Sequence, residues 1–176
     1  GAAGAIAVVF NDKRDYAVTG ADVYGAVYDL DDGGLVGAST ELLAVAGNEH
    51  FPVVTATQEL FVAAMAAENG IVSSRTLGAD GTAGAGAVAL TQTNAGSRPL
   101  ALSWDGDQGL ALAWRDKAEA RVRLRVLAND GTYDGELTDG FDVGETLSSV
   151  SGYLNTYSGE ISLSYSVADQ RSVVAW

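Results

Sequence analysis

Short apolar segments alternate with polar turns along the whole chain, which is the pattern of β-strands joined by tight connections. The clearest example is the segment PLALSWDGDQGLALAW, from Pro99 to Trp114. Two apolar stretches, 100–104 and 110–114, flank a turn that contains two Gly and two Asp residues. Gly and Asp adopt the backbone dihedrals of tight turns, and Leu, Ala and Trp pack well on a pleated surface. The segment therefore predicts a β-hairpin.

Two weaker copies of this hairpin occur elsewhere. One is SLSYSVADQRSVVAW at 162–176, and the other is PVVTATQELFVAAM at 52–65, where Met replaces the final Trp. The segment 57–69 is rich in alanine and also has apolar residues at helical spacing. Its alignment with the two Trp-ended strands favours a strand.

The turns give the repeat a period. Asp-Gly pairs begin at Asp32, Asp80 and Asp130, which are 48 and 50 residues apart. A period of about 40–50 residues with four short strands per unit is typical of a propeller blade. We therefore predict an all-β, β-propeller-type repeat in a single domain, 1–176, that forms all or part of a propeller. It has about three four-stranded blades, at about 11–65, 66–114 and 115–176, and one extra strand at 1–10.

The hydrophobic pattern also predicts which strands are covered. The stretch 110–114 is apolar on both faces, as a strand enclosed by neighbouring sheets should be. The segment Arg121–Val126 alternates Arg with Val or Leu, which predicts an outer strand whose arginines face water. Its counterpart 23–28 carries Tyr24 and Tyr28 at the positions of the apolar residues, so we expect both tyrosines to pack against an adjacent blade.

Composition narrows the classes of function. The chain has 47% hydrophobic residues, no cysteine and a net charge of −13. Disulfides and thiolate metal sites are excluded, and no apolar run approaches the roughly 18–20 residues of a membrane helix. The negative charge disfavours nucleic acid, because a small cluster of three arginines at 121–125 cannot reverse its field. We expect neither a membrane span nor a nucleic-acid partner.

Two acidic turns fit the pattern D-x-D-x-G. Alternating carboxylates on a tight loop can converge on Ca²⁺, which makes Asp29, Asp31, Asp105 and Asp107 candidate ligands. Each pattern has Gly where many calcium loops place a third side-chain oxygen, and no bidentate Glu follows. Asp and Gly are also the ordinary residues of hairpin turns. Both interpretations stay open, with calcium as the possible cofactor.

The aromatic residues suggest a second kind of site. Trp114 and Trp176 end apolar strands at matching positions, which is typical of packing between blades. Trp104 adjoins a turn, where its ring is placed either to pack or to bind a glycan. The chain has a single histidine, His50, and no G-x-S-x-G nucleophile elbow, so we predict no enzyme. Paired carboxylates of a glycoside hydrolase are the distant alternative, because 23 acidic residues allow many pairs.

Several of these segments together resemble a bacterial extracellular β-propeller repeat family. They are DVYGAVYDLDDGGLVG at 22–37, LANDGTYDG at 127–135, and the Trp-ended hairpin with the Arg-Asp that follows it. In that family the hairpin is followed by an acidic loop, a Val/Ile-Tyr-Gly strand and an Asp-Gly-Thr turn; the second cycle here lacks the Tyr-Gly. The resemblance implies a surface or binding module, extracellular or at the cell surface in a mature or processed chain. It implies no catalytic residues.

Three blades are fewer than the four to eight that usually close a ring. The leading hypothesis is therefore a non-catalytic structural module that self-assembles through its blades and terminal strands into a ring or a filament. Further blades of a longer chain would also complete the propeller. The alternative function is a carbohydrate-binding lectin with sites between blades.

Overall fold

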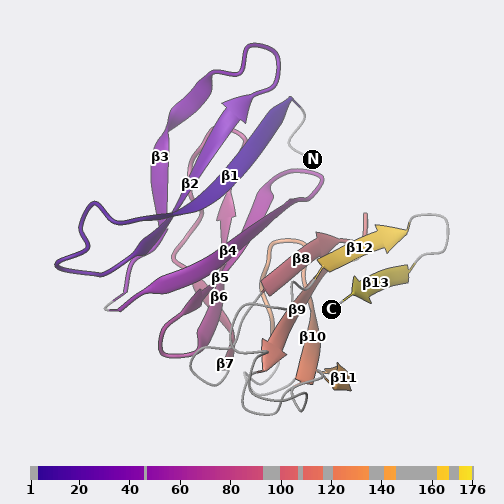
Figure 1. Ribbon diagram of the computed structural model, residues 1–176. Coiled ribbons are helices and arrows are strands. Elements are labelled where there is room, and N and C mark those ends of the chain that lie inside the picture. Colours follow the sequence, from indigo (N-terminus) through magenta and orange to yellow (C-terminus); the bar gives the residue numbers. More distant parts are fainter. Residues whose placement is uncertain are drawn as a thin grey trace.

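A computed structural model of the protein describes residues 4–45, 47–92, 100–106, 109–116, 121–134, 141–145, 162–166 and 171–175. Every regular element in these ranges is a β-strand, which confirms the all-β class. The strands form three antiparallel sheets and a terminal hairpin, which follow one another in chain order (Figure 1). None of the described segments is a helix long and apolar enough to cross a membrane.

Each sheet is an up-and-down meander in which consecutive strands pair. The first sheet contains β1 (Ala5–Asp12), β2 (Asp22–Asp29) and β3 (Leu35–Leu43). The second contains β4 (Glu49–Ala56), β5 (Phe61–Ala67), β6 (Ile71–Leu77) and β7 (Val88–Gln92). The third contains β8 (Leu100–Trp104), β9 (Leu110–Asp116), β10 (Arg121–Leu127) and β11 (Phe141–Glu145). The terminal hairpin pairs β12 (Ser162–Ser166) with β13 (Arg171–Ala175).

The three predicted hairpins are confirmed. In the hairpin formed by β8 and β9, Leu100 pairs with Trp114 and Trp104 pairs with Leu110. Within the segment that has helical spacing, residues 61–67 form strand β5, and its alternate residues are buried on the two faces of the sheet. The repeat units derived from the sequence begin midway through a sheet: the boundary at 65/66 divides β5, which pairs with β4 on one edge and β6 on the other. A periodic pattern gives the length of a unit and not its starting point.

The sheets stack face to face through two apolar layers. Phe61, Ala63 and Met65 of β5 pack against the first sheet. Val62, Ala64 and Ala66 of the same strand pack against the third sheet. All seven residues of β5 are buried, which explains why the strand is apolar on both faces. Beyond the third sheet, Ala101, Ala113 and Val122 form a further buried cluster, and β12 lies against β8.

The structural repeat extends to hydrogen bonds in the turns. In the turn after β6, Asp80 Oδ1 accepts hydrogen bonds from the Thr82 backbone N–H at 3.0 Å and from its hydroxyl at 2.6 Å. In the turn after β10, Asp130 accepts the same two bonds from Thr132, at 3.0 and 2.7 Å. The glycine between each pair has φ near +80°, at 81° in Gly81 and 79° in Gly131, which favours glycine. The Asp-Gly-Thr turn is therefore one repeated structural unit.

These turns predict a specific acid sensitivity. The hydroxyl of Thr82 lowers the pKa of Asp80 below its usual value of 3.8, and the Thr82 backbone N–H adds a smaller effect. Thr132 lowers the pKa of Asp130 in the same two ways. A carboxylate with a lowered pKa in the folded state stabilises it at higher pH and loses that contribution as the pH falls below the unfolded pKa. We expect the midpoint temperature of thermal unfolding to decrease as the pH is lowered below about 4. This decrease should be smaller in a Thr82→Val/Thr132→Val variant. Thermal unfolding followed by circular dichroism across pH checks this.

Thr40→Val is the matched control for this experiment. The Thr40 hydroxyl donates to the carbonyl of Gly81 at 3.1 Å and touches no carboxylate. Its removal should lower the midpoint by a similar amount at every pH. An unchanged pH profile in the Thr82/Thr132 double variant would contradict the prediction.

A β-bulge recurs at the same place in each sheet. The register shifts between Val23 and Tyr24, between Val72 and Ser73, and between Val122 and Arg123. The extra residues on the partner strands are Leu42, Leu90 and Val143. The residue at a bulge is left unpaired in the ladder, so its carbonyl needs another donor.

Two arginines at equivalent positions supply that donor across the sheet interface. Arg75 pairs with Ala63 in the ladder and donates to the Leu42 carbonyl of the first sheet at 3.2 Å. Arg125 pairs with Leu112 and donates to the Leu90 carbonyl of the second sheet. The Arg125 guanidinium also lies 4.0 Å from the centre of the Tyr133 ring. We call these two arginines the arginine clamps; the equivalent residue of the first sheet, Ala26, carries no such group.

The expectation for the arginine strand is therefore wrong. Arg125 is 1% exposed and Val126 is 56% exposed, and β10 lies between β9 and β11 rather than at the sheet edge. The reason is that the bulge carbonyl and an aromatic ring solvate the guanidinium inside the interface.

The predicted alignment of the two tyrosines with the apolar residues of the arginine strand is offset by one residue, because Tyr24 pairs with Phe10 as Arg123 pairs with Trp114. Tyr24 is buried beside Phe10 and Arg14, but Tyr28 is 36% exposed.

Candidate functional site

The first sheet has an open apolar face. Its members come from adjacent positions on three paired strands: Ile6 and Val8 on β1, Tyr28 on β2, and Leu35 on β3. These side chains are 48%, 43%, 36% and 48% exposed, respectively. We call this set the open face. The opposite side of the same sheet carries Ala5, Ala7, Val9, Val23 and Val27, which pack on the second sheet.

The equivalent positions in the other two sheets are buried. Phe10, Met65 and Trp114 occupy the same ladder position, so Val8 corresponds to Ala63 and Leu112, and Ile6 to Phe61 and Leu110. Each of these equivalents in the second and third sheets is at most 4% exposed, because a preceding sheet covers it. The open face is thus the same surface without its covering sheet.

The turn beside the open face shows the same difference. An added Cβ at Gly81 would lie 2.6 Å from the Val36 carbonyl oxygen, and one at Gly131 would lie 2.7 Å from Val62 Cγ1. Both contacts are with the preceding sheet. The equivalent Gly33 has φ of 71° but meets nothing within 4 Å. This turn therefore shares the positive φ of the others, although it is one residue longer, and the position beside its glycine is open.

A loop covers only the far end of this surface. Arg14 lies 4.5 Å from the centre of the Tyr24 ring, and its guanidinium pairs with the Asp12 carboxylate at 2.5 Å. Tyr24 is 8% exposed as a result, and burial is the main cause of its raised hydroxyl pKa. Among the described residues, β1 pairs only with β2, so its other edge offers backbone groups to a further strand.

A second feature is a hollow between the second and third sheets. Its volume is about 280 Å³, and it is lined by Thr57, Gln58, Glu59, Leu60, Trp104, Asn129 and Asp130. Residues 57–60 form the β4–β5 turn, Trp104 ends β8, and the last two residues lie in the turn after β10. The hollow brings the predicted ligand-binding residue next to polar side chains from a different sheet.

Hydrogen bonds hold both walls of the hollow. The Trp104 indole N–H donates to Asn129 Oδ1 at 2.9 Å, and the Trp104 ring packs against the apolar layer between the sheets. On the other wall, the Thr57 backbone N–H and hydroxyl donate to the Leu60 carbonyl at 2.8 and 3.0 Å. The walls are therefore formed before any ligand arrives.

Comparisons of the chain with protein-family models, curated proteins and solved structures found no match. No relative therefore assigns a role to the open face or to the hollow. Their function has to be inferred from their own geometry.

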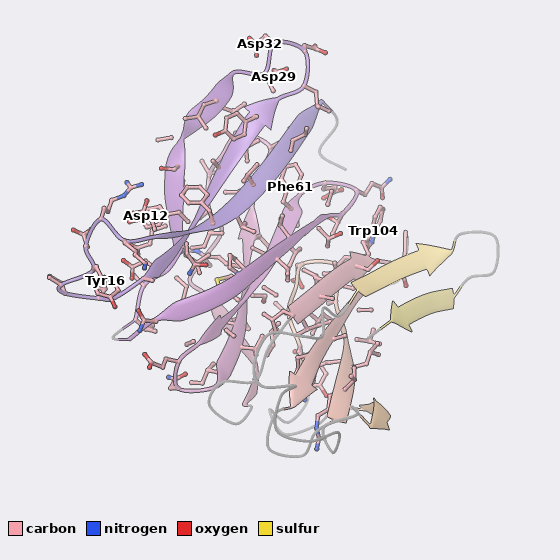
Figure 2. All side chains as sticks on the ribbon, viewed as in Figure 1. Asp12, Tyr16, Asp29, Asp32, Phe61 and Trp104 are labelled. Atoms are coloured by element: carbon pink, nitrogen blue, oxygen red, sulfur yellow. The ribbon has the colours of Figure 1, made fainter. Side chains whose placement is uncertain are left out.

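The acidic candidates are used within their turns. Asp29 Oδ1 accepts a hydrogen bond from the Asp31 backbone N–H at 2.7 Å, and Asp105 Oδ1 accepts one from Gly109 at 3.0 Å. Asp29 lies at the tip of the first sheet, away from Trp104 (Figure 2). Asp107 lies outside the described residues, as does Trp176. Within the described ranges no three His, Cys, Asp or Glu side chains group as metal ligands, and calcium binding stays a prediction.

Sequence reasoning missed most of both sites. It identified Trp104 but not Gln58, Glu59 or Asn129, because the residues around the ring come from separate turns. The position of Asn129 directly before the Asp-Gly-Thr turn is the sequence feature that could have identified it as a residue lining the hollow. It also missed the open face, although aligning Ile6 and Val8 with the buried strand β9 would have marked them as interface residues.

Proposed function

We propose that this protein is a non-catalytic structural module in which the three sheets act as propeller-type blades and copies of the chain assemble through the open face. The observation that carries the proposal is the exposure of Ile6 and Val8, whose equivalents in the next two sheets are at most 4% exposed. Meander sheets stacked face to face are also the construction of a propeller. An extracellular or cell-surface location accords with this role.

A second copy is the occupant best matched to the open face. Inside the chain, that kind of face is always covered by the opposite face of another such sheet, so the interface is heterologous. Each copy has the open face at one end of its stack of sheets and the terminal hairpin at the other end. Contacts of this kind between copies build a ring when the rotation closes and a filament when it does not.

The expected association is modest in strength. Ile6, Val8 and Leu35 each retain about half of their exposed surface, so burying each one should contribute about 1 kcal/mol. Hydrogen bonds along the free edge of β1 add to this, while association itself carries an entropic cost. We therefore expect weak association, which becomes detectable as the protein concentration is raised.

Sedimentation equilibrium of wild type and an Ile6→Glu/Val8→Glu variant tests the proposal. The wild type should associate as concentration rises, and the variant should remain a monomer with an unchanged thermal midpoint, because both side chains are already exposed within one chain. Val18→Glu is the matched control, since Val18 is 82% exposed and lies outside the open face. A wild type that stays monomeric at all concentrations would instead favour a preceding sheet in a longer chain.

A further inference from the structure

The hollow between the second and third sheets has a composition that points to a ligand class. Its volume of about 280 Å³ lies just below the roughly 300–1,000 Å³ of pockets for drug-sized molecules. Its lining combines one large aromatic ring with hydroxyl, amide and carboxylate groups from two sheets. We propose that this hollow binds one ring of a neutral carbohydrate against the indole of Trp104.

The position of Trp104 suits this role. Its indole N–H is engaged by Asn129 Oδ1 at 2.9 Å, so the ring has a fixed orientation. Part of the ring packs against the buried layer, and part of it lines the hollow. A pyranose has a face of C–H groups that packs on an aromatic ring through dispersion and the hydrophobic effect. A ring already held in place loses little entropy when that face binds.

The polar lining suits hydroxyl groups better than other partners. Sugar hydroxyls both donate and accept hydrogen bonds, and the hollow offers amide donors at Gln58 together with carboxylate acceptors at Glu59 and Asp130. A cationic nitrogen group has no acceptor atom, whether or not it carries N–H groups, and would leave the amide donors unused. The carboxylates and the net charge of −13 repel an anionic ligand. A wholly apolar ligand would leave these polar groups desolvated without partners.

The site is complete within one chain and does not depend on assembly. Every lining residue belongs to the second or third sheet, and the open face belongs to the first. Binding should therefore be equal in the wild type and in the Ile6→Glu/Val8→Glu variant. Loss of assembly without loss of binding, or the reverse, separates the two proposals.

Titration of the ¹⁵N-labelled protein followed by NMR tests the site. The probes are D-glucose, D-galactose, D-mannose and N-acetyl-D-glucosamine, with D-glucuronate and choline as charged comparators. At least one neutral sugar should shift the Trp104 indole resonance and the amides of 57–60 with a millimolar dissociation constant, ahead of both charged probes. The proposal is overturned when no neutral sugar shifts these resonances, when the shifts map elsewhere, or when choline binds in preference.

Substitutions localise the binding further. Trp104→Ala should weaken the sugar by about tenfold or more, and Trp104→Phe should retain part of the affinity because a ring remains. Gln58→Ala, at an exposed turn position that leaves the fold intact, should weaken it about threefold. Tyr16→Ala is the control, because Tyr16 is a 54% exposed aromatic residue on a different loop (Figure 2). Unchanged affinity in both Trp104→Ala and Gln58→Ala would overturn the proposal.

Discussion

Arg125→Ala should lower the free energy of unfolding by about 2–4 kcal/mol, measured by urea denaturation. The substitution leaves the Leu90 carbonyl at the bulge without its donor and removes the cation that lies over the Tyr133 ring. It also opens a cavity, since Arg125 is among the largest fully buried side chains. The result would show that an arginine clamp stabilises the interface between the second and third sheets.

Arg14→Ala is the matched control for the clamp. Arg14 also lies over an aromatic ring and pairs with a carboxylate, but 53% of its side chain is exposed. Exposed ion pairs typically contribute at most about 1 kcal/mol, so this variant should stay close to wild type. Equal losses in the Arg14→Ala and Arg125→Ala variants would mean that burial in the interface contributes nothing.

Gly81→Ala should destabilise the protein by about 2–4 kcal/mol, and Gly33→Ala by only about 1–2 kcal/mol. Both glycines have positive φ, so alanine strains the backbone in each. Only at Gly81 does the added Cβ also meet the preceding sheet, 2.6 Å from the Val36 carbonyl oxygen. The difference between the two variants therefore measures the contact between a turn and the sheet before it. Urea denaturation of both variants gives this difference directly.

Assembly adds a concentration dependence to this comparison. When a second copy covers the open face, the added methyl group at Gly33 meets a neighbour as it does at Gly81. Gly33→Ala should then also weaken self-association in sedimentation experiments. Equal destabilisation of the two variants in the monomer would contradict the stacked arrangement of the sheets.

Local patterns were sufficient to predict the strands and hairpins. The apolar segments on both sides of the 105–109 turn fix a hairpin by themselves, because strand alternation and turn dihedrals are local properties. The burial of Trp114 and the strand conformation of β5 followed from their positions in the repeat. The all-β class could therefore be predicted from the sequence.

Interactions between sheets could not be predicted in this way. A strict alternation of Arg with Val or Leu predicts arginines in water, whereas Arg125 is buried because a carbonyl 35 residues away needs a donor. The bulge that frees this carbonyl has no marked sequence signal. The hollow around Trp104 likewise depends on how two turns meet across an interface. Such features depend on the packing of one sheet against the next.

Hydroxyl-radical footprinting of the wild type at two protein concentrations is the most direct test of the stack. It tests whether each sheet covers the equivalent face of the next sheet, and whether a second copy covers the open face. In the dilute protein, Tyr28 and Leu35 should be labelled while Met65 and Trp114 remain protected, in keeping with their exposed fractions. In the concentrated protein, labelling of Tyr28 and Leu35 should fall and that of Val18 should stay constant. Labelling of Met65 and Trp114 in the folded monomer would contradict the stack, and concentration-independent labelling of Tyr28 and Leu35 would contradict assembly through the open face.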